Sequence, residues 1–339
     1  MPSTPRHLVI AAGNSNVFTG TEGWQVLEEV TEDITKRENI TSDSVYFAMT
    51  GVIGETFSAQ PLLDGLAQCS YVPSDAGLWQ QAATAIMTTD TFAKGSTKTA
   101  YIGDTKVLIN GFAKGSGMVA PDMATMLAFV FTDAEIPQPL LQQMLSAAMK
   151  NSFHSISVDS DTSTSDSVMC IATGAKSCPQ AESIDNALYA DFRAGLQYVC
   201  EDLAWQVVSD GEGVTRIMQV EVSGAKTAQE ARCAALSIAN SPLVKTALSG
   251  GDANWGRVVM AVGKSGVALD PEKVSVHFGD HLLAKAGGAC VFDTAALDEY
   301  VQQQEVRIRV ALGVGVGKAC IYGNDLSYEY IRINADYRS

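Results

Sequence analysis

Two short patterns in the sequence hold residue types that could carry out phosphate chemistry. Asp159 and Asp161 follow a strand-like segment, Ser155–Val158, where some phosphatases place their nucleophilic and acid/base carboxylates. Ser163 and Thr164 stand where those sites, or a calcium-binding EF-hand, would need other residues. A turn rich in Asp, Ser and Thr that hydrogen-bonds its own backbone is therefore the interpretation that we favour.

Two Gly-Lys pairs suggest a phosphate-binding loop, but both depart from the pattern G-x-x-x-x-G-K-[ST]. Before Gly317-Lys318, Leu312 fills the first glycine position, and Ala319 replaces the hydroxyl residue. Before Gly263-Lys264-Ser265, Val258 replaces the first glycine. Both pairs are therefore predicted to be turns between strands, and nucleotide binding is not favoured.

Histidine and cysteine chemistry is also poorly supported. The chain has four histidines, and only His277 and His281 are spaced i, i+4, in a segment with strand-like character. No Cys-x-x-Cys pair occurs among the seven cysteines. We therefore predict no metal site, no Ser-His-Asp triad and cysteines that are mostly reduced core residues.

The most specific pattern is the string from Gly111 to Leu127, GFAKGSGMVAPDMATML. On general grounds it is a Gly-rich loop that enters a buried apolar segment. As a whole it closely resembles the self-cleavage segment of the bifunctional ornithine acetyltransferase family, also called glutamate N-acetyltransferases. Further segments resemble that family in the same order along the chain: Gly13–Asn16, Thr50–Gly54, Ile86–Thr91, Asp161–Asp166, Ser209–Gly213, Asn240–Thr246, Asp252–Arg257 and Tyr330–Tyr337.

The resemblance implies autoproteolysis between Ala124 and Thr125, which would divide the protein into an α chain (1–124) and a β chain (125–339). The hydroxyl of Thr125 would attack the Ala124 carbonyl, and the Gly-rich approach supplies backbone freedom for the bend. Cleavage would release the α-amine of Thr125, whose ordinary pKa of about 7.7–8.0 suits a general base for its own hydroxyl. No histidine is then needed.

The resemblance further implies a ping-pong transfer of acetyl from N-acetylornithine to glutamate through acetyl-Thr125. Thr50, through its hydroxyl, and Gly51, through its N–H, would form the oxyanion hole. By charge, Lys114 would face a substrate carboxylate and Glu212 the ornithine ammonium group. Without the family context they would be a solvated loop lysine and a helix-end carboxylate. The matched substrate-contacting positions are Thr88, Lys114, Thr125, Glu212, Asn334 and Ser339.

Alternatives remain at this stage. An amidase or aminopeptidase-type hydrolase would use the same nucleophile and deliver the acyl group to water. The family carries strand-forming sequence before its Gly-Asn-x-Asn segment, which this chain reaches at Gly13, so an inactive, unprocessed homologue is a third hypothesis. The chain ends in Ser339, where the family usually ends in Thr. No cofactor is expected, and the use of acetyl-CoA as a further donor is left open.

These residues must be positioned by interleaved strands and helices. Apolar periodicity predicts an α+β protein, and the resemblance implies a layered α/β/β/α-type sandwich of mixed sheets with a smaller C-terminal α/β part from about residue 225. Thr19 and Glu22 have capping-box spacing before a helix whose apolar positions include Trp24. The other predicted helices are 74–87, 137–150, 182–208, 228–239 and 294–304, and the predicted strands are 8–12, 45–49, a hairpin over 97–112, 155–158, 167–172, 215–223, 274–278, 306–311 and 319–322.

Net charge and hydropathy disfavour several classes of binding partner and cellular location. With 23 Lys and Arg against 38 Asp and Glu, the net charge of −15 disfavours nucleic acid and anionic membranes. No apolar run approaches the roughly 18 residues of a membrane helix, and Leu8–Ala12 is too short for a secretory signal. We therefore expect a cytoplasmic enzyme acting on small molecules. By resemblance it would assemble as a heterotetramer of two α and two β chains.

Overall fold

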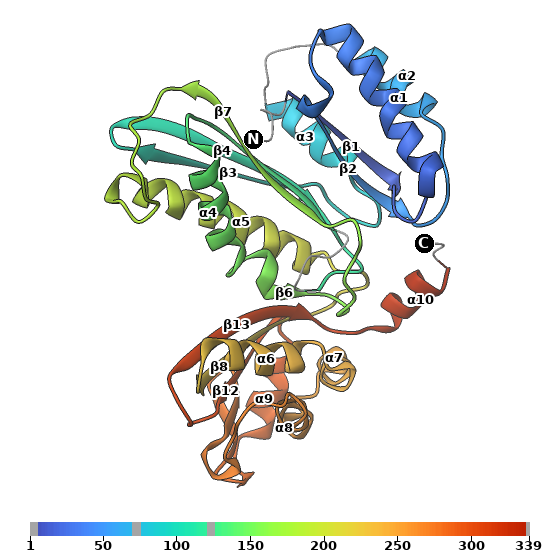
Figure 1. Cartoon of the computed structure of the whole chain (residues 1–339). Coiled ribbons are helices and arrows are strands. Elements are labelled where there is room, and N and C mark those ends of the chain that lie inside the picture. The colour runs from blue at the N-terminus through green and yellow to red at the C-terminus, as the bar shows by residue number, and fades with distance from the viewer. Residues whose placement is uncertain (1–5, 70–75, 121–125, 337–339) are drawn as a thin grey trace.

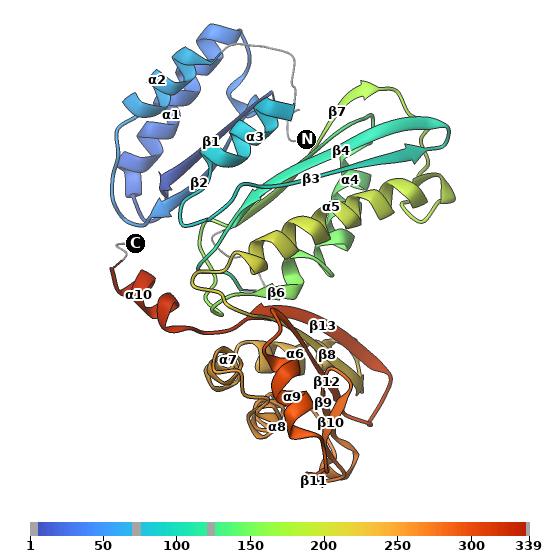
Figure 2. The ribbon, with the colours of Figure 1, turned by 180° about the vertical axis from the view of Figure 1, so that it is seen from behind.

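The computed structural model describes residues 6–69, 76–120 and 126–336 (Figure 1). The chain forms three sheets: a parallel pair, a four-stranded mixed sheet and a seven-stranded mixed sheet. Helices cover the outer faces of the first two, and the third lies below them with its own helices (Figures 1 and 2). This confirms the predicted α+β class.

The outermost layers are α1 (Gly20–Glu38) and α2 (Gln60–Gln68), which cover β1 (His7–Asn14) and β2 (Val45–Val52). Val26, Val30 and Ile34 of α1 pack with Val9 of β1 in one apolar cluster. The capping box was a wrong prediction, because Thr19 has helical backbone angles and its hydroxyl donates to Asn16 instead. Trp24 is 62% exposed and lies off the buried face.

The other face of β1–β2 packs against the four-stranded sheet, which has the order β3-β4-β5-β7. Its strands are β3 (Lys94–Ile102), β4 (Thr105–Lys114), β5 (Leu127–Ala134) and β7 (Ser167–Lys176), with β5 and β7 parallel and the other pairs antiparallel. Ala48 of β2 shares a cluster with Phe112 and Phe129, and α3 (Ala76–Ala85) contributes Ala83 to it.

The second face of this sheet carries α4 (Gln138–Met149) and α5 (Ala190–Ser209), which bury a large apolar cluster against β3 and β4. The layers therefore follow the order α/β/β/α, as expected. The predicted helix from residue 182 begins later, because the Asn186 side chain accepts from the Leu188 N–H and closes a separate 3₁₀ turn before Ala190.

The seven-stranded sheet has the order β11-β10-β9-β12-β8-β13-β6. Its core lies between the sheet and helices that include α6 (Ala228–Ala239), whose Ala231 and Ala235 are fully buried. The strands are β6 (Ile156–Ser157), β8 (Ile217–Ala225), β9 (Ser275–Phe278), β10 (His281–Lys285), β11 (Gly288–Ala289), β12 (Glu305–Ala311) and β13 (Gly317–Asn324). The helices are α6 (Ala228–Ala239), α7 (Pro242–Ser249), α8 (Trp255–Gly263) and α9 (Thr294–Val301).

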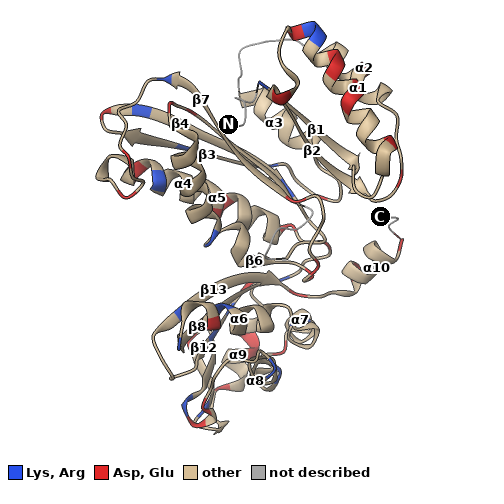
Figure 3. Ribbon diagram, viewed as in Figure 1, with Lys and Arg blue, Asp and Glu red and all other residues tan. Residues whose placement is uncertain are grey.

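A last helix, α10 (Tyr328–Asp336), leaves this sheet and runs toward the β1–β2 layer (Figures 1 and 2). Acidic positions recur along α1, whereas basic positions are spread over several elements (Figure 3). None of the helices in the described part of the chain is long and apolar enough to span a membrane.

Candidate active site

The end of β4 and the start of β5 flank the predicted cleavage site. Lys114, the last residue of β4, pairs in antiparallel register with Leu127, the first residue of β5. Ala124 and Thr125 lie outside the described residues, as does Ser339. The described residue that follows the predicted cleavage site in β5, Leu127, therefore lies beside Lys114.

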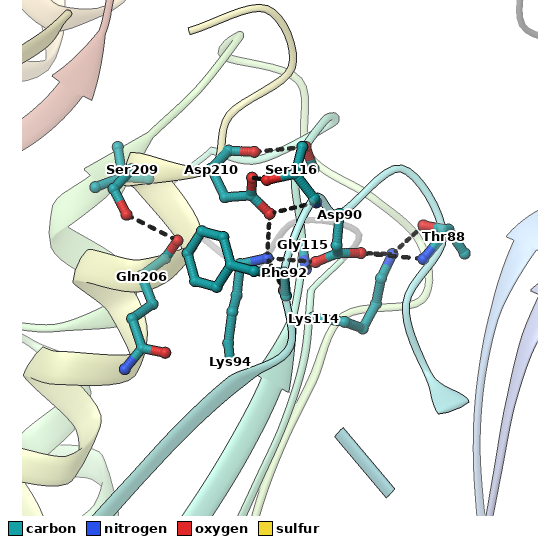
Figure 4. A network of polar contacts seen from close by, with 12 residues as sticks. Thr88, Asp90, Phe92, Lys94, Lys114, Gly115, Ser116, Gln206, Ser209 and Asp210 are labelled. Carbon is teal, nitrogen blue, oxygen red and sulfur yellow. Dashed lines mark hydrogen bonds and ion pairs between the residues drawn. The ribbon is translucent and has the colours of Figure 1, made fainter. Parts of the chain in front are cut away.

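Lys114 is a buried side chain that contacts another predicted substrate-binding residue. Its Nζ atom donates to Thr88 Oγ1 at 2.7 Å and lies 3.9 Å from Asp90 Oδ2 (Figure 4). It is 2% exposed, so the alternative of a solvated loop lysine is wrong. Burial lowers the pKa of Lys114, while the Asp90 carboxylate opposes this shift. The site therefore offers a cation with little water around it.

A buried ionic cluster of Lys94, Asp90 and Asp210 lies next to Lys114. Lys94 is completely buried, and its Nζ atom donates at 2.6 Å to both Asp90 and Asp210 (Figure 4). Asp90 also accepts the Gly115 N–H at 2.7 Å. Burial alone raises the pKa of Asp90, but Lys114, Lys94 and the hydrogen bonds together hold it below its ordinary value. This cluster fixes the loop that follows β4.

Sequence reasoning missed this cluster. Asp90 and Asp210 fall inside two of the segments that resemble the acetyltransferase family. The resemblance therefore pointed to these positions, but the sequence did not show that they bind a lysine. Lys94 has no such signal, because a lysine at the start of a strand is ordinary in sequence. Only the fold brings it to a carboxylate 116 residues away.

Thr50 and Gly51 lie near the end of β2, on the layer that faces the four-stranded sheet. Thr50 is fully buried, and its Oγ1 atom has no hydrogen-bond partner within the described ranges. Side chains two apart on a strand share a face, so Thr50 faces the same side as Ala48, which packs with Phe112 and Leu127. A buried hydroxyl that lacks a partner is costly and is available to a ligand.

The backbone conformation at position 51 requires a glycine. Its φ is +137°, and a Cβ atom there would lie 2.2 Å from the backbone carbon of Gly13 on β1. Any larger residue would push β2 away from β1 at the position next to Thr50.

Glu212 and Asn334 are brought together from distant parts of the chain. The Asn334 amide on α10 donates to Glu212 Oε2 at 2.7 Å. The Glu212 carboxylate lies against Gly117, where a Cβ atom would be 2.4 Å from Oε2. Ser116 links this pair to the ionic cluster: its carbonyl accepts the Glu212 N–H, and its hydroxyl donates to the Asp210 carbonyl at 2.6 Å. Glu212 and Lys114 therefore belong to one connected region.

Asp159 has a structural role, as the favoured interpretation of its segment predicted. It accepts from the backbone N–H groups of Met118 at 2.6 Å and Val119 at 2.9 Å, and from Asp161 in its own turn. The Tyr330 hydroxyl donates to it at 3.1 Å. Both of its oxygens are therefore occupied, which leaves none for nucleophilic chemistry. In the described part of the chain, no group of three or more His, Cys, Asp or Glu side chains could hold a metal ion.

Comparison with known proteins agrees with this geometry. A family model described as ArgJ family matches residues 2–339. The chain is 46% identical to the arginine biosynthesis bifunctional protein ArgJ of Brucella suis and 47% identical to that of Mesorhizobium japonicum, covering 98% of this chain and 82% of each relative. The crystal structure of the Bacillus halodurans protein of the same name superimposes with a TM-score of 0.58 at 40% identity, covering 62% of this chain and 98% of that one.

The fold, the site and these relatives define an acyltransferase with an α+β sandwich. It acts on small molecules in amino-acid biosynthesis. The chain belongs to the ArgJ family.

Proposed function

We propose that this protein cleaves itself between Ala124 and Thr125 and then transfers acetyl from N-acetylornithine to glutamate through acetyl-Thr125. The observation that carries the proposal is the pairing of Lys114 with Leu127 at the junction of β4 and β5. This pairing ties the chain of the nucleophile, two residues before Leu127, to a buried lysine that contacts Thr88.

In the cleavage step, the Thr125 hydroxyl adds to the carbonyl carbon of Ala124. The C–N bond breaks, the hydroxyl proton ends on the departing nitrogen, and an ester joins Ala124 to the Thr125 oxygen. Water hydrolyses that ester, which leaves a carboxylate on Ala124 and a free α-amine and hydroxyl on Thr125. The two ends then belong to an α chain (1–124) and a β chain (125–339).

In the transfer step, the α-amine of Thr125 accepts the hydroxyl proton as the oxygen attacks the acetyl carbonyl. The C–N bond of N-acetylornithine breaks, ornithine takes the proton and leaves, and glutamate attacks the acetyl ester in the reverse sense. The Thr50 hydroxyl and the Gly51 N–H would stabilise both oxyanions, and the buried, unpartnered Oγ1 of Thr50 supports this role. The scheme uses no cofactor.

The charges of Lys114 and Glu212 predict which charged group of the substrates each residue would bind. Lys114 would bind a substrate carboxylate, with Thr88 beside it as a second hydrogen-bonding group. Glu212, held by Asn334, would bind the side-chain ammonium of ornithine. Ser339 would provide a further contact from the end of the chain. We further propose that two α and two β chains form a heterotetramer and that the enzyme works in the cytoplasm.

Denaturing mass spectrometry of the purified protein is the first test. Two fragments that meet at Ala124 and Thr125 are expected, whereas Thr125→Ala should stay intact. An intact wild-type chain would overturn the mechanism.

A coupled product assay then separates transfer from hydrolysis. Incubation with N-acetylornithine and glutamate should yield acetylglutamate, and release of acetate alone would identify a hydrolase instead. Replacing N-acetylornithine with acetyl-CoA in the same assay measures whether the thioester is also a donor.

A further inference from the structure

Lys245 is a buried lysine outside the candidate active site. It lies in α7 and is 4% exposed. Its Nζ atom donates to the backbone carbonyl of Asn324 and, at 3.0 Å, to Asn324 Oδ1. Asn324 is the last residue of β13 and is 1% exposed. An interior ammonium group is costly unless it is hydrogen-bonded, so these two contacts stabilise the lysine where it lies.

Lys245 also fixes the direction in which the Asn324 amide points. Because the ammonium group donates to Oδ1, the Nδ2 end of the amide must face away from the lysine. There it donates to the Val208 carbonyl at 3.4 Å, near the C-terminal end of α5. The last carbonyls of a helix have no partner within the helix, so Asn324 supplies one of them with a donor from β13.

The same amide packs against the turn that carries Glu212. A Cβ atom at Gly211 would lie 1.9 Å from Asn324 Nδ2, so the amide occupies the space of a side chain at position 211. Glu212 follows directly, and its N–H donates to the Ser116 carbonyl at 2.9 Å. A displacement of Asn324 would therefore move the backbone one residue before Glu212.

The chain beyond Asn324 leads to the partner of Glu212. The Ser327 hydroxyl donates to the Gly213 carbonyl at 2.6 Å, and α10 begins at the next residue. Asn334 of α10 then donates to the Glu212 carboxylate. Asn324 therefore lies where both members of this pair are placed, one by the turn that packs against it and the other by the chain that follows it.

We propose that Lys245 is a positioning residue for the pair Glu212–Asn334 and that it acts through Asn324. This inference rests on the proposed function, in which Glu212 binds the side-chain ammonium of ornithine. In this arrangement Lys245 does not touch the substrate. It holds the end of β13 against the turn after α5, so that the Glu212 carboxylate keeps its place.

Nearby carboxylates maintain the charge of Lys245. Burial lowers the pKa of Lys245 to about 8, while Asp325 and Asp159 oppose this shift. The protonated form therefore predominates near pH 7. Asp325 also accepts the N–H groups of Thr215 and Arg216, at 2.8 and 3.0 Å, which ties the residue after Asn324 to the chain that enters β8.

The test compares the two half-reactions, since kcat/KM for each substrate of a ping-pong enzyme reports its own half. Lys245→Met removes the ammonium group and keeps an apolar side chain. It should lower kcat/KM for N-acetylornithine about 10-fold and kcat/KM for glutamate by less than about 2-fold.

A second variant covers the case in which Lys245→Met does not fold. Asn324→Asp keeps both acceptors for Lys245 but loses the N–H that binds Val208. It should show the same selective loss with N-acetylornithine. A wild-type ratio of the two kcat/KM values in Asn324→Asp would overturn the proposal.

Val262→Ala is the matched control. Val262 lies in α8, is 2% exposed and packs in the apolar core of the same layer, and its side chain takes part in none of these hydrogen bonds. The cavity should lower Tm and leave the ratio of the two kcat/KM values unchanged. If Lys245→Met also lowers Tm without changing that ratio, Lys245 has a structural role alone and the proposal is overturned.

A double-mutant cycle tests the route through Glu212. When Glu212 is already Gln, Lys245→Met should change kcat/KM for N-acetylornithine by less than about 2-fold, because the interaction that it supports is gone. An undiminished loss of about 10-fold would count against the proposal. If the wild type forms no acetylglutamate, the proposed function fails together with this inference, whereas an active wild type with no selective effect of Lys245→Met removes this inference alone.

Discussion

Lys114 and Thr88 are 26 residues apart in the sequence, yet their side chains meet at 2.7 Å, where the buried lysine reaches an exposed threonine. The lysine comes from the end of a strand and the threonine from the turn after α3. Their contact joins a positive charge to a hydroxyl at the end of β4, where Lys114 pairs with Leu127 of β5.

Replacing Lys114 with Met should weaken the use of glutamate severely. A hydrogen bond to a charged group contributes roughly 1.5–3 kcal/mol, so kcat/KM for glutamate should fall about 10–150-fold. Lys106→Met is the control, since Lys106 lies exposed on the same strand. Steady-state kinetics with glutamate as the varied substrate provide the measurement, and an unchanged kcat/KM would show that the carboxylate binds elsewhere.

Replacing Lys94 with Met should destabilise the protein. The two carboxylates it now pairs would be left buried without their shared cation, and breaking such a pair costs roughly 3–5 kcal/mol. Thermal unfolding should show a clear drop in Tm. Lys36→Met removes the exposed Lys36–Glu32 pair and should leave Tm nearly unchanged. Equal effects of the two substitutions would contradict the role of the buried cluster.

The same cluster predicts a pH dependence of stability. The pKa of Asp90 is lower in the folded protein than in the unfolded chain, so its contribution to stability is complete above the unfolded value of about 3.9. That contribution is lost as the pH falls through the lower, folded pKa. Urea unfolding of wild type and Asp90→Asn should therefore differ most above about pH 5 and converge in strong acid. If the difference in free energy of unfolding between wild type and Asp90→Asn grew as the pH fell, the lowered pKa of Asp90 would be refuted.

Gly51→Ala should abolish activity and lower stability, because its Cβ atom would collide with the backbone of Gly13 and its φ of +137° suits only glycine. Gly65→Ala provides the comparison. Gly65 lies in α2, where an added Cβ atom would have no neighbour within 4 Å, so alanine there should stabilise by up to about 1 kcal/mol. Denaturant unfolding and the acetyl-transfer assay should separate the two glycines, and an active Gly51→Ala enzyme would contradict the proposed oxyanion hole.

Replacing Glu212 with Gln should raise KM for N-acetylornithine more than KM for glutamate, since only the first carries a side-chain ammonium group. The glutamine still accepts a hydrogen bond from Asn334, so the fold of α10 should persist. Initial rates with each substrate varied in turn test this. Equal changes in both KM values would indicate that Glu212 acts on the whole site rather than on ornithine.

Much of the fold could be predicted because most elements bury one apolar face. The helix at 228–239 and the strand pair around Gly103 are correct, since periodicity and turn chemistry agree there. α10 was missed because none of its residues is buried, and Tyr328 is 94% exposed, so it has no apolar stripe to detect. α7 and α8 were missed because they are short.

The candidate site also has residues that could be predicted from the sequence and residues that could not. Family motifs predicted Lys114, Thr88, Glu212 and Asn334, and the fold joins them in two contacting pairs. The role of Lys94 could not be predicted, because it depends on the two carboxylates that the fold brings to its ammonium group. The local sequence around a residue does not show which distant residues will contact it in the folded protein.

The strands β4 and β5 fall on opposite sides of the Ala124–Thr125 bond, yet they are neighbours in one sheet over the register Ile109–Lys114. A cut there would release a covalent link without parting the two pieces, since each supplies hydrogen bonds and apolar surface that the other lacks. Separately produced pieces would each expose a bare strand edge and tend to aggregate. The proposed cleavage would therefore give two chains that fold together as one polypeptide but are poor candidates for reassembly once they have been separated.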